Sequence, residues 1–170
     1  GKGVLGHLQG FGNPKILVND ISIEDDTIKK FNVEWSSKEK IYKQSDIVTL
    51  HLPLTGKSKD MIKKDHLLSM KTDAIIINTS RGGIINESDL YEVMQSGHLS
   101  GAAIDVFDKE PYDGDLKSIE RCLLTAHIGS MSVDCRTQME IEATEEVVRF
   151  LTGKTLNGLV PEEEYAVQRE

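Results

Sequence analysis

Five short apolar runs, separated by segments of helical character, constrain the fold of this chain more than any other feature of its sequence. Residues 74–77 read Ala-Ile-Ile-Ile and are apolar at every position, as in a strand that is buried on both faces. The runs predicted as strands are residues 15–18, 47–52, 74–77, 101–107 and 122–127. Continuous apolar strands that alternate with helices are typical of parallel βαβ units, so we expect an α/β fold.

Two of the intervening segments carry clear helix signals. Residues 87–96 follow Asn86, which suits an N-cap, and precede Gly97, which suits the residue just past a helix end. In residues 133–151 apolar side chains recur every four positions, at Met139, Ala143, Val147 and Leu151. These helices and the apolar strands predict a doubly wound parallel sheet of the Rossmann type, with three layers, αβα.

The first six residues, GKGVLG, place Gly1, Gly3 and Gly6 in the G-x-G-x-x-G spacing of a dinucleotide-binding loop. Asp20 ends the next predicted strand, about 20 positions further on. A carboxylate there accepts hydrogen bonds from the ribose hydroxyls of NAD and repels the 2′-phosphate of NADP. Ordinary turns also collect glycines, and a strand-end aspartate also caps turns or helices, so both alternatives stay open.

Two features near Gly1 depart from a complete dinucleotide-binding unit. No strand precedes Gly1, although the strand before such a loop is central in a doubly wound sheet. Only eight residues, His7 to Pro14, separate Gly6 from the next predicted strand, which suits a long crossover helix badly. We therefore expect the first strand to be missing, and the chain to be a fragment or to have lost residues before Gly1 and near His7.

Composition excludes several classes of function. The 170 residues suffice for one domain with a core, and the net charge of −8 argues against a general nucleic-acid binder. No apolar stretch approaches the roughly 18 residues of a membrane helix. The two cysteines, Cys122 and Cys135, lack the histidine spacing of zinc sites. We therefore expect no metal site, no disulfide framework and a cytoplasmic location.

Polar residues that follow the predicted strands are candidates for chemistry, because ligands sit at the carboxyl edge of open parallel sheets. Arg81, in INTSRGGIIN, offers a planar fork of donors that suits a carboxylate. His127 can protonate an oxygen while a hydride arrives at the adjacent carbon, and Glu110 can hold its imidazole. Asp105 could accept a hydrogen bond from a nicotinamide carboxamide. Taken singly, these residues also fit a surface arginine, a structural histidine, a loop carboxylate and a capped aspartate.

Five stretches combine into a more specific pattern: GKGVLG, HLPLTGKSKDMI, INTSRGGIINESDL, GAAIDVFDKEP and LLTAHIGSMS. In this order, over nearly the whole chain, they resemble the nucleotide-binding domain of the D-isomer-specific 2-hydroxyacid dehydrogenases, which include phosphoglycerate dehydrogenase. The last four stretches are specific, whereas the glycine stretch is generic. The resemblance implies NAD as the cofactor, a small 2-oxo or 2-hydroxy acid as the substrate, and hydride transfer between them.

The resemblance also assigns roles to individual residues. Arg81 binds the substrate carboxylate and keto oxygen, His127 is the acid/base, and Glu110 is its partner. The residues implied for cofactor binding are Gly1, Gly3, Val4, Leu5, Gly6, Asp20, Pro53, Thr79, Ser80, Arg81, Asp105, His127, Gly129 and Ser130. We also keep His51, at a strand end, as a residue of the cofactor side.

Domain organisation follows from the same resemblance. Residues 1–157 are expected to form an NAD-binding domain truncated at its N-terminus, and residues 158–170 a tail that leads back toward an absent substrate-binding domain. The chain alone is therefore expected to be inactive, and a homodimer through the nucleotide-binding domain is expected. One alternative is an NAD(H)-responsive scaffold that resembles the carboxy-terminal-binding corepressors. Another is a structural domain that binds no nucleotide.

Overall fold

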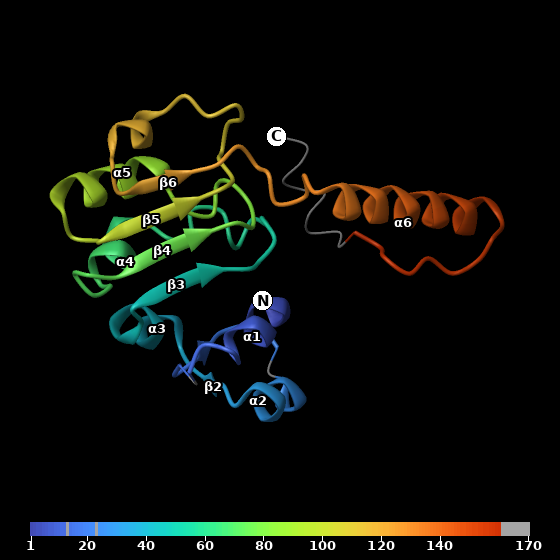
Figure 1. Ribbon diagram of the computed structural model, residues 1–170, viewed down its shortest axis with the longest axis horizontal. Helices are drawn as coiled ribbons and strands as arrows, with labels where there is room; N and C mark the ends of the chain where they lie inside the picture. Colours follow the sequence, from blue (N-terminus) through green and yellow to red (C-terminus); the bar gives the residue numbers. More distant parts are fainter. Residues whose placement is uncertain (13, 23, 161–170) are drawn as a thin grey trace.

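The computed structural model describes residues 1–12, 14–22 and 24–160, and its strands form two parallel sheets (Figure 1). The smaller sheet pairs β1 (Leu17–Val18) with β2 (Glu34–Trp35). The larger sheet has the order β3 (Ile47–Leu50), β4 (Ile75–Asn78), β5 (Gly101–Ile104) and β6 (Cys122–Leu124). Because all its pairings are parallel, the carboxyl ends of these four strands meet at one edge.

Each of the five predicted runs contains a strand, which confirms the α/β class with parallel pairing. The strand β2 was not predicted, because Glu34–Trp35 offers no apolar run. In a doubly wound order a central strand lies between β1 and β3. The residues that the structure describes place no strand there, so the strands divide into two sheets. Of the tail expected at residues 158–170, residues 161–170 lie outside the described part of the chain.

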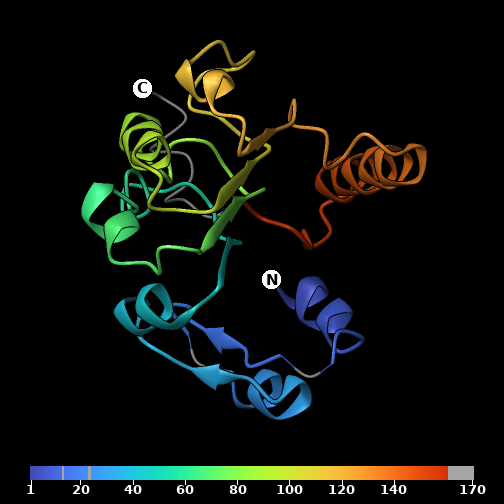
Figure 2. The same cartoon turned by 60° about the vertical axis from the view of Figure 1, so that its left-hand side comes forward.

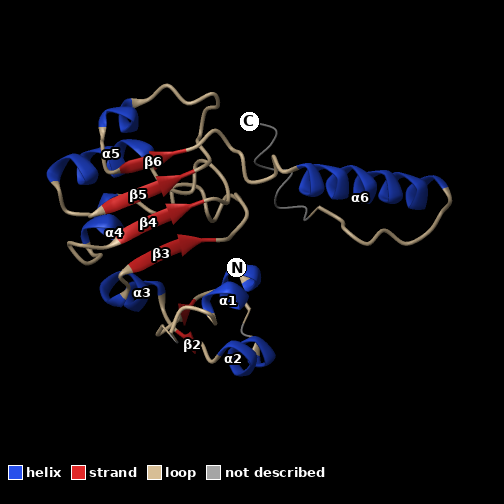
Figure 3. Cartoon of the chain, viewed as in Figure 1, coloured by secondary structure: helices blue, strands red, loops and turns tan. Residues whose placement is uncertain are grey.

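Helices alternate with the strands along the chain (Figure 3). They are α1 (Lys2–Leu8), α2 (Asp25–Phe31), α3 (Lys38–Gln44), α4 (Lys64–Leu68), α5 (Glu87–Ser96), the 3₁₀ helix η1 (Asp115–Ser118) and α6 (Val133–Leu151). The bounds of α5 and α6 coincide with the predicted ranges. At α5 the Asn86 side chain accepts a hydrogen bond from the Asp89 N–H, and Gly97 follows with φ at 81°. These two residues satisfy free backbone groups at the helix ends, as their sequence pattern indicates.

The glycine stretch opens a helix, which is the element that a dinucleotide-binding stretch begins. Its role in cofactor binding stays a prediction. Gly1 is the N-cap of α1, while Gly3 and Gly6 lie inside the helix, which begins with a bond from the Leu5 N–H to the Gly1 carbonyl. A Cβ at Gly3 or Gly6 would meet nothing within 4 Å, so no close approach requires glycine at either position.

The core lies on one face of the larger sheet. Alternate strand residues such as Val48, Ile76 and Ile104 are buried there, against Leu67 of α4 and Leu90 of α5. Figure 2 shows these two helices together on one side of the sheet. The strand residues that alternate with these buried ones point to the opposite face of the sheet. The apolar side chains exposed on that face are Ile47, Ile75 and Leu123.

Helix α6 extends away from the larger sheet (Figure 1) and has no buried residue. Its sequence stripe includes Met139, Val147 and Leu151, all of them exposed. The apolar stripe that predicted the helix therefore meets no partner within the described chain. Together with the exposed sheet face, it leaves a large apolar surface uncovered.

Candidate active site

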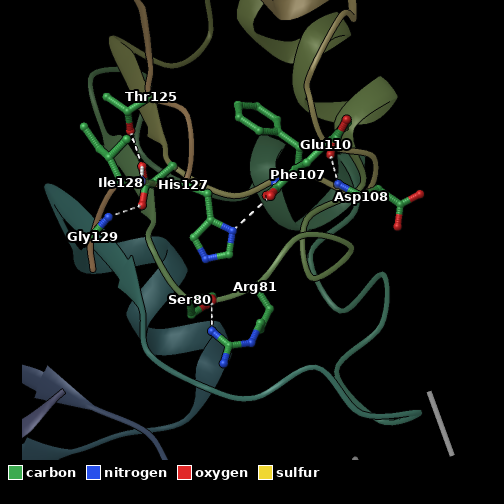
Figure 4. A network of polar contacts seen from close by, with 11 residues as sticks. Ser80, Arg81, Phe107, Asp108, Glu110, Thr125, His127, Ile128 and Gly129 are labelled. Carbon is green, nitrogen blue, oxygen red and sulfur yellow. Dashed lines mark hydrogen bonds and ion pairs between the residues drawn. The ribbon is translucent and has the colours of Figure 1, made fainter. Parts of the chain in front are cut away.

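The three residues predicted to carry chemistry lie around one pocket at the carboxyl edge of the larger sheet. Arg81 follows β4, Glu110 lies in the loop after β5, and His127 follows β6. The pocket measures about 320 Å³ and is lined by Leu54, Arg81, Gly82, Phe107, Asp108, Glu110 and His127. In Figure 4 the His127 ring lies between the Glu110 loop and the Ser80–Arg81 segment. The fold thus brings together side chains that are up to 46 positions apart in the sequence (127 − 81).

His127 and Glu110 form a pair. Nδ1 of His127 lies 3.0 Å from Oε2 of Glu110, while Oε1 of Glu110 accepts a hydrogen bond from the Phe107 N–H at 3.0 Å. Burial raises the pKa of Glu110, but the bonds from Phe107 and His127 and the His127 charge outweigh it, so its pKa is lowered. Glu110 is therefore a carboxylate near neutral pH and only accepts hydrogen bonds, which places a proton on Nδ1. The other ring nitrogen, Nε2, remains available for a substrate.

The backbone of His127 is unusual. Its φ is 52°, in the left-handed region that non-glycine residues rarely adopt, at a cost of about 1–2 kcal/mol. The His127 N–H donates to the Asp105 carbonyl at 2.8 Å, which ties the residue to the end of β5. Left-handed residues of this kind cluster at functional sites, where the surroundings hold them in place.

Arg81 is held by the residues that precede it. The buried Asn78 side chain accepts bonds from both the Ser80 N–H and the Ser80 hydroxyl, and it donates to the Arg81 carbonyl at 2.9 Å. The Arg81 guanidinium is exposed and donates to the Ser80 carbonyl. Among the described residues it has no carboxylate partner, so its charge is available to a ligand. Resemblance to the family implies that Asn78 contacts the cofactor together with Thr79 and Ser80; that its buried amide holds the arginine loop was not predicted.

Gly82 brings the arginine loop against the loop after β5. A Cβ at this position would lie 1.9 Å from the Phe107 carbonyl oxygen and 2.6 Å from the Asp108 nitrogen. Because both are backbone atoms, no side-chain rotation could relieve the contact. Gly83 supplies the turn itself, with φ at 73°. The two glycines therefore have different functions, one for close approach and one for a left-handed turn.

Asp105 is buried, and its side chain accepts hydrogen bonds from the loop that carries His127; Figure 4 labels the donors Thr125, Ile128 and Gly129. Its Oδ1 accepts bonds from the Thr125 hydroxyl at 2.5 Å and the Ile128 N–H at 3.0 Å, and its Oδ2 accepts from the Gly129 N–H at 3.3 Å. Burial raises the pKa of Asp105, but these bonds and the His127 charge more than offset it, so its pKa is lowered. Sequence reasoning did not identify Thr125, whose position in a strand end carries no motif.

Glu87, at the start of α5, is a further residue that the sequence did not indicate. Its Oε1 accepts a hydrogen bond from the Asp108 N–H at 2.7 Å, so it supports the loop between Phe107 and Glu110. Burial, together with the charges of Asp108 and Glu110, raises the pKa of Glu87 although the Asp108 N–H lowers it. Helix α5 and the loop between Phe107 and Glu110 are therefore joined through this carboxyl group.

The residues predicted to bind the cofactor are spread over several elements. Asp20 is exposed after β1, with Oδ1 accepting from the Ile21 N–H at 2.7 Å. Thr79 is exposed and Ser80 is half-buried in the arginine loop. Pro53 is exposed, and its carbonyl accepts from the buried Ser58 hydroxyl. Gly129 and Ser130 follow His127.

The residues at the start of α1 complete this set. Gly1 lies beside His51, since a Cβ on Gly1 would be 3.7 Å from the His51 Cβ, so the start of α1 meets the carboxyl end of β3. Val4 is exposed, whereas Leu5 is buried and faces the protein interior. Burial lowers the pKa of His51, whose Nε2 lies 3.1 Å from the Thr49 hydroxyl.

Comparison with known proteins identifies the family. Residues 1–129 match the model for the D-isomer specific 2-hydroxyacid dehydrogenase, NAD binding domain. The chain belongs to this family. The match covers α1 through the loop of His127, so the elements around the pocket are those of an NAD-binding domain.

Individual relatives agree. The chain is 36% identical over 165 residues to a glyoxylate reductase of Korarchaeum cryptofilum, covering 96% of this chain and 49% of that protein. It is 33% identical over 139 residues to a D-3-phosphoglycerate dehydrogenase of Bacillus subtilis, covering 81% and 26%. The crystal structure of a glyoxylate reductase from Paecilomyes thermophila superposes with a TM-score of 0.86 at 26% identity, covering 94% and 48%. The chain thus spans about half the length of the first of these relatives, and less of the second.

Proposed function

We propose that this chain is the NAD-binding half of a dehydrogenase that interconverts a small 2-oxo acid, such as glyoxylate, and the corresponding 2-hydroxy acid, of D configuration where C2 is a stereocentre. The observation that carries the proposal is the His127–Glu110 pair, which lines one pocket together with Arg81. Among the described residues the Arg81 guanidinium has no carboxylate partner. A carboxylate anchor beside an acid/base pair is the arrangement that reduction of a 2-oxo acid needs. The named relatives include glyoxylate reductases, which supports the substrate class.

The residues present fit NAD. Asp20 offers an exposed carboxylate for ribose hydroxyls, and Thr79 offers an exposed hydroxyl on the loop that carries Arg81. The start of α1 lies against the end of β3, where Gly1 presents no side chain. We propose that Asp20 and the start of α1 hold the adenosine and pyrophosphate side, and that Thr79, Ser80 and Asp105 face the nicotinamide side.

The chemistry follows from the charges of the pocket. When bound, NADH supplies a hydride to the C2 carbon of the substrate. Arg81 binds the carboxylate, because its planar donors suit two oxygens at once. The oxygen on C2 then gains negative charge, and Nε2 of protonated His127 donates a proton to it. Glu110 stabilises the charged imidazole and keeps Nδ1 engaged, so the ring presents Nε2 to the pocket. Oxidation of the hydroxy acid uses neutral His127 as the base.

We further propose that residues 1–157 form the NAD-binding domain and that residues 158–170 lead toward a substrate-binding domain. A homodimer is supported by the apolar surface made of Ile47, Ile75 and Leu123 on the sheet, together with the exposed stripe of α6. The two cysteines, Cys122 and Cys135, are unpaired, which is consistent with a reducing cytoplasm. Among the described residues, no helix combines the length and apolarity that a bilayer crossing requires.

Cofactor binding is tested on the chain itself by titration with NADH and NADPH. The fluorescence of Trp35, the single tryptophan, reports on the site because Trp35 pairs with Val18, two residues before Asp20. We expect saturable binding of NADH and weaker binding of NADPH. An equal affinity for the two dinucleotides would remove the role proposed for Asp20.

Turnover is tested in a chimaera in which this chain replaces the matching region of the Korarchaeum cryptofilum glyoxylate reductase. The expected result is NADH oxidation that depends on glyoxylate and is lost in His127→Asn. If a chimaera that folds and binds NADH shows no turnover, the dehydrogenase proposal is wrong. In that case binding of peptides would be measured, since a scaffold function is the remaining alternative.

A further inference from the structure

We propose that Asp105 and Thr125 act as positioning residues that hold the His127 loop in its left-handed conformation and thereby fix the imidazole on Glu110. The inference rests on the function proposed above for His127, and it adds two residues to the machinery. Neither residue contacts the His127 ring. Their effect is exerted through the backbone of residues 125–129.

The first support is the number of bonds that converge on one buried carboxylate. The two Asp105 oxygens accept from the Thr125 hydroxyl and from the N–H groups of Ile128 and Gly129. The two backbone donors follow His127 directly, and the hydroxyl precedes it by two residues. The carboxylate therefore binds both flanks of His127 at once. Hydrogen bonds to an ionised acceptor are the stronger kind, so this arrangement resists opening of the loop.

The second support is the backbone of Asp105 itself. Its carbonyl accepts the His127 N–H at 2.8 Å, so the same residue also binds the strained position between the two flanks. A non-glycine residue at φ 52° persists only where its neighbours are held. Here the backbone N–H groups of residues 127–129 all donate to Asp105, which is 7% exposed.

The third support is the orientation of the imidazole. With the loop held, Nδ1 meets Glu110 at 3.0 Å although the two residues come from different loops. If the loop relaxed to an ordinary backbone conformation, the direction of the His127 side chain would change and this contact would be lost. The bonds from Asp105 to residues 125–129, called the anchor below, therefore set which ring nitrogen faces the pocket.

The experiment compares Thr125→Val, Thr125→Ser and Asp105→Asn with the unchanged chain, and uses Glu110→Gln as a control. Hydrogen exchange of the Ile128 and Gly129 amides is measured by NMR, together with titration of the Glu110 carboxyl carbon. In Thr125→Val we expect exchange to accelerate about tenfold or more, since the carboxylate loses a partner of its network. We also expect the pKa of Glu110 to rise toward its ordinary value, because His127 no longer donates to it. Asp105→Asn is expected to give the larger change in both.

Thr125→Ser keeps the hydroxyl and should behave as the unchanged chain does. Glu110→Gln should leave the amide exchange unchanged, because it does not touch the anchor. Unaltered exchange and an unaltered Glu110 titration in a folded Thr125→Val chain would overturn the inference. If Asp105→Asn fails to fold, the two threonine variants still decide it. None of these measurements uses NADH or substrate, so failure of the anchor is distinguishable from failure of the proposed dehydrogenase function.

Discussion

Replacement of Gly82 by alanine tests the packing that unites the two halves of the pocket. The new Cβ would lie 1.9 Å from the Phe107 carbonyl oxygen, whereas real Cβ contacts essentially never fall below 3.0 Å. The two loops must therefore separate by at least 1.1 Å (3.0 − 1.9). A displacement of about 1 Å at a reacting centre lowers the rate about 100-fold. We expect kcat/KM for glyoxylate to fall by about that factor in the chimaera.

The same substitution should destabilise the chain, because overpacking against fixed backbone costs about 1–3 kcal/mol. For a chain of this size that corresponds to a decrease in the unfolding midpoint of about 2–12 °C. Gly56→Ala is the matched control, since a Cβ at Gly56 meets nothing within 4 Å. The reasoning is refuted if Gly82→Ala and Gly56→Ala have the same kcat/KM and the same unfolding midpoint.

Other substitutions address single roles. Arg81→Lys should lower kcat/KM for glyoxylate by about 10–100-fold, because lysine cannot make the bidentate contact, and should leave the Kd for NADH unchanged. A rise of the same size in the Kd for NADH would show that Arg81 binds the cofactor instead of the substrate. Asp20→Ser should weaken NADH binding about tenfold and reduce the preference over NADPH, and an unchanged ratio of the two Kd values would contradict this. Asp105 has a lowered pKa in the folded chain, so its contribution to stability is present above its ordinary value and is lost as pH falls through the folded value. The unfolding midpoint of Asp105→Asn should therefore lie below that of the unchanged chain at neutral pH, and the two midpoints should converge in strong acid. A difference between the midpoints that stays constant with pH would contradict a stabilising role of the Asp105 charge.

The larger sheet was predictable from sequence because its strands are short and mostly apolar. Ala74 to Ile77 reads as a strand buried on both faces, and it does contribute to β4. The burial on both faces was wrong, because Ile75 is exposed on the face that no described helix covers. Helices α5 and α6 were predicted to the residue because Asn86, Gly97 and their apolar spacing act locally. The smaller sheet was partly missed, since β2 is two residues long and polar at Glu34.

The glycine stretch was predictable as a spacing but not as a function. Gly1 is the N-cap of α1, and Gly3 and Gly6 lie inside the helix, as in a stretch that opens a helix. Binding of a pyrophosphate there is a proposal about a ligand, and the spacing of three glycines does not encode the contacts with it.

The site was predictable as a set of residues but not as a geometry. Arg81, Glu110 and His127 stand at strand ends, and parallel pairing puts those ends at one edge. The left-handed φ of His127, the contact of Gly82 with the Phe107 carbonyl and the bond of Thr125 to Asp105 are long-range features. They depend on how the loops meet after the sheet has formed, so no local pattern reveals them.

The most direct test is deuterium transfer. The chimaera is incubated with NADH that carries deuterium at both C4 positions, [4,4-²H₂]NADH, and with glyoxylate, and the glycolate formed is examined by NMR for deuterium at C2. The account predicts deuterium at C2, with transfer lost in His127→Asn and in Arg81→Gln while both variants still bind NADH. A chimaera that binds NADH and transfers no deuterium, or one whose transfer survives the loss of His127, would contradict the assignment of these residues.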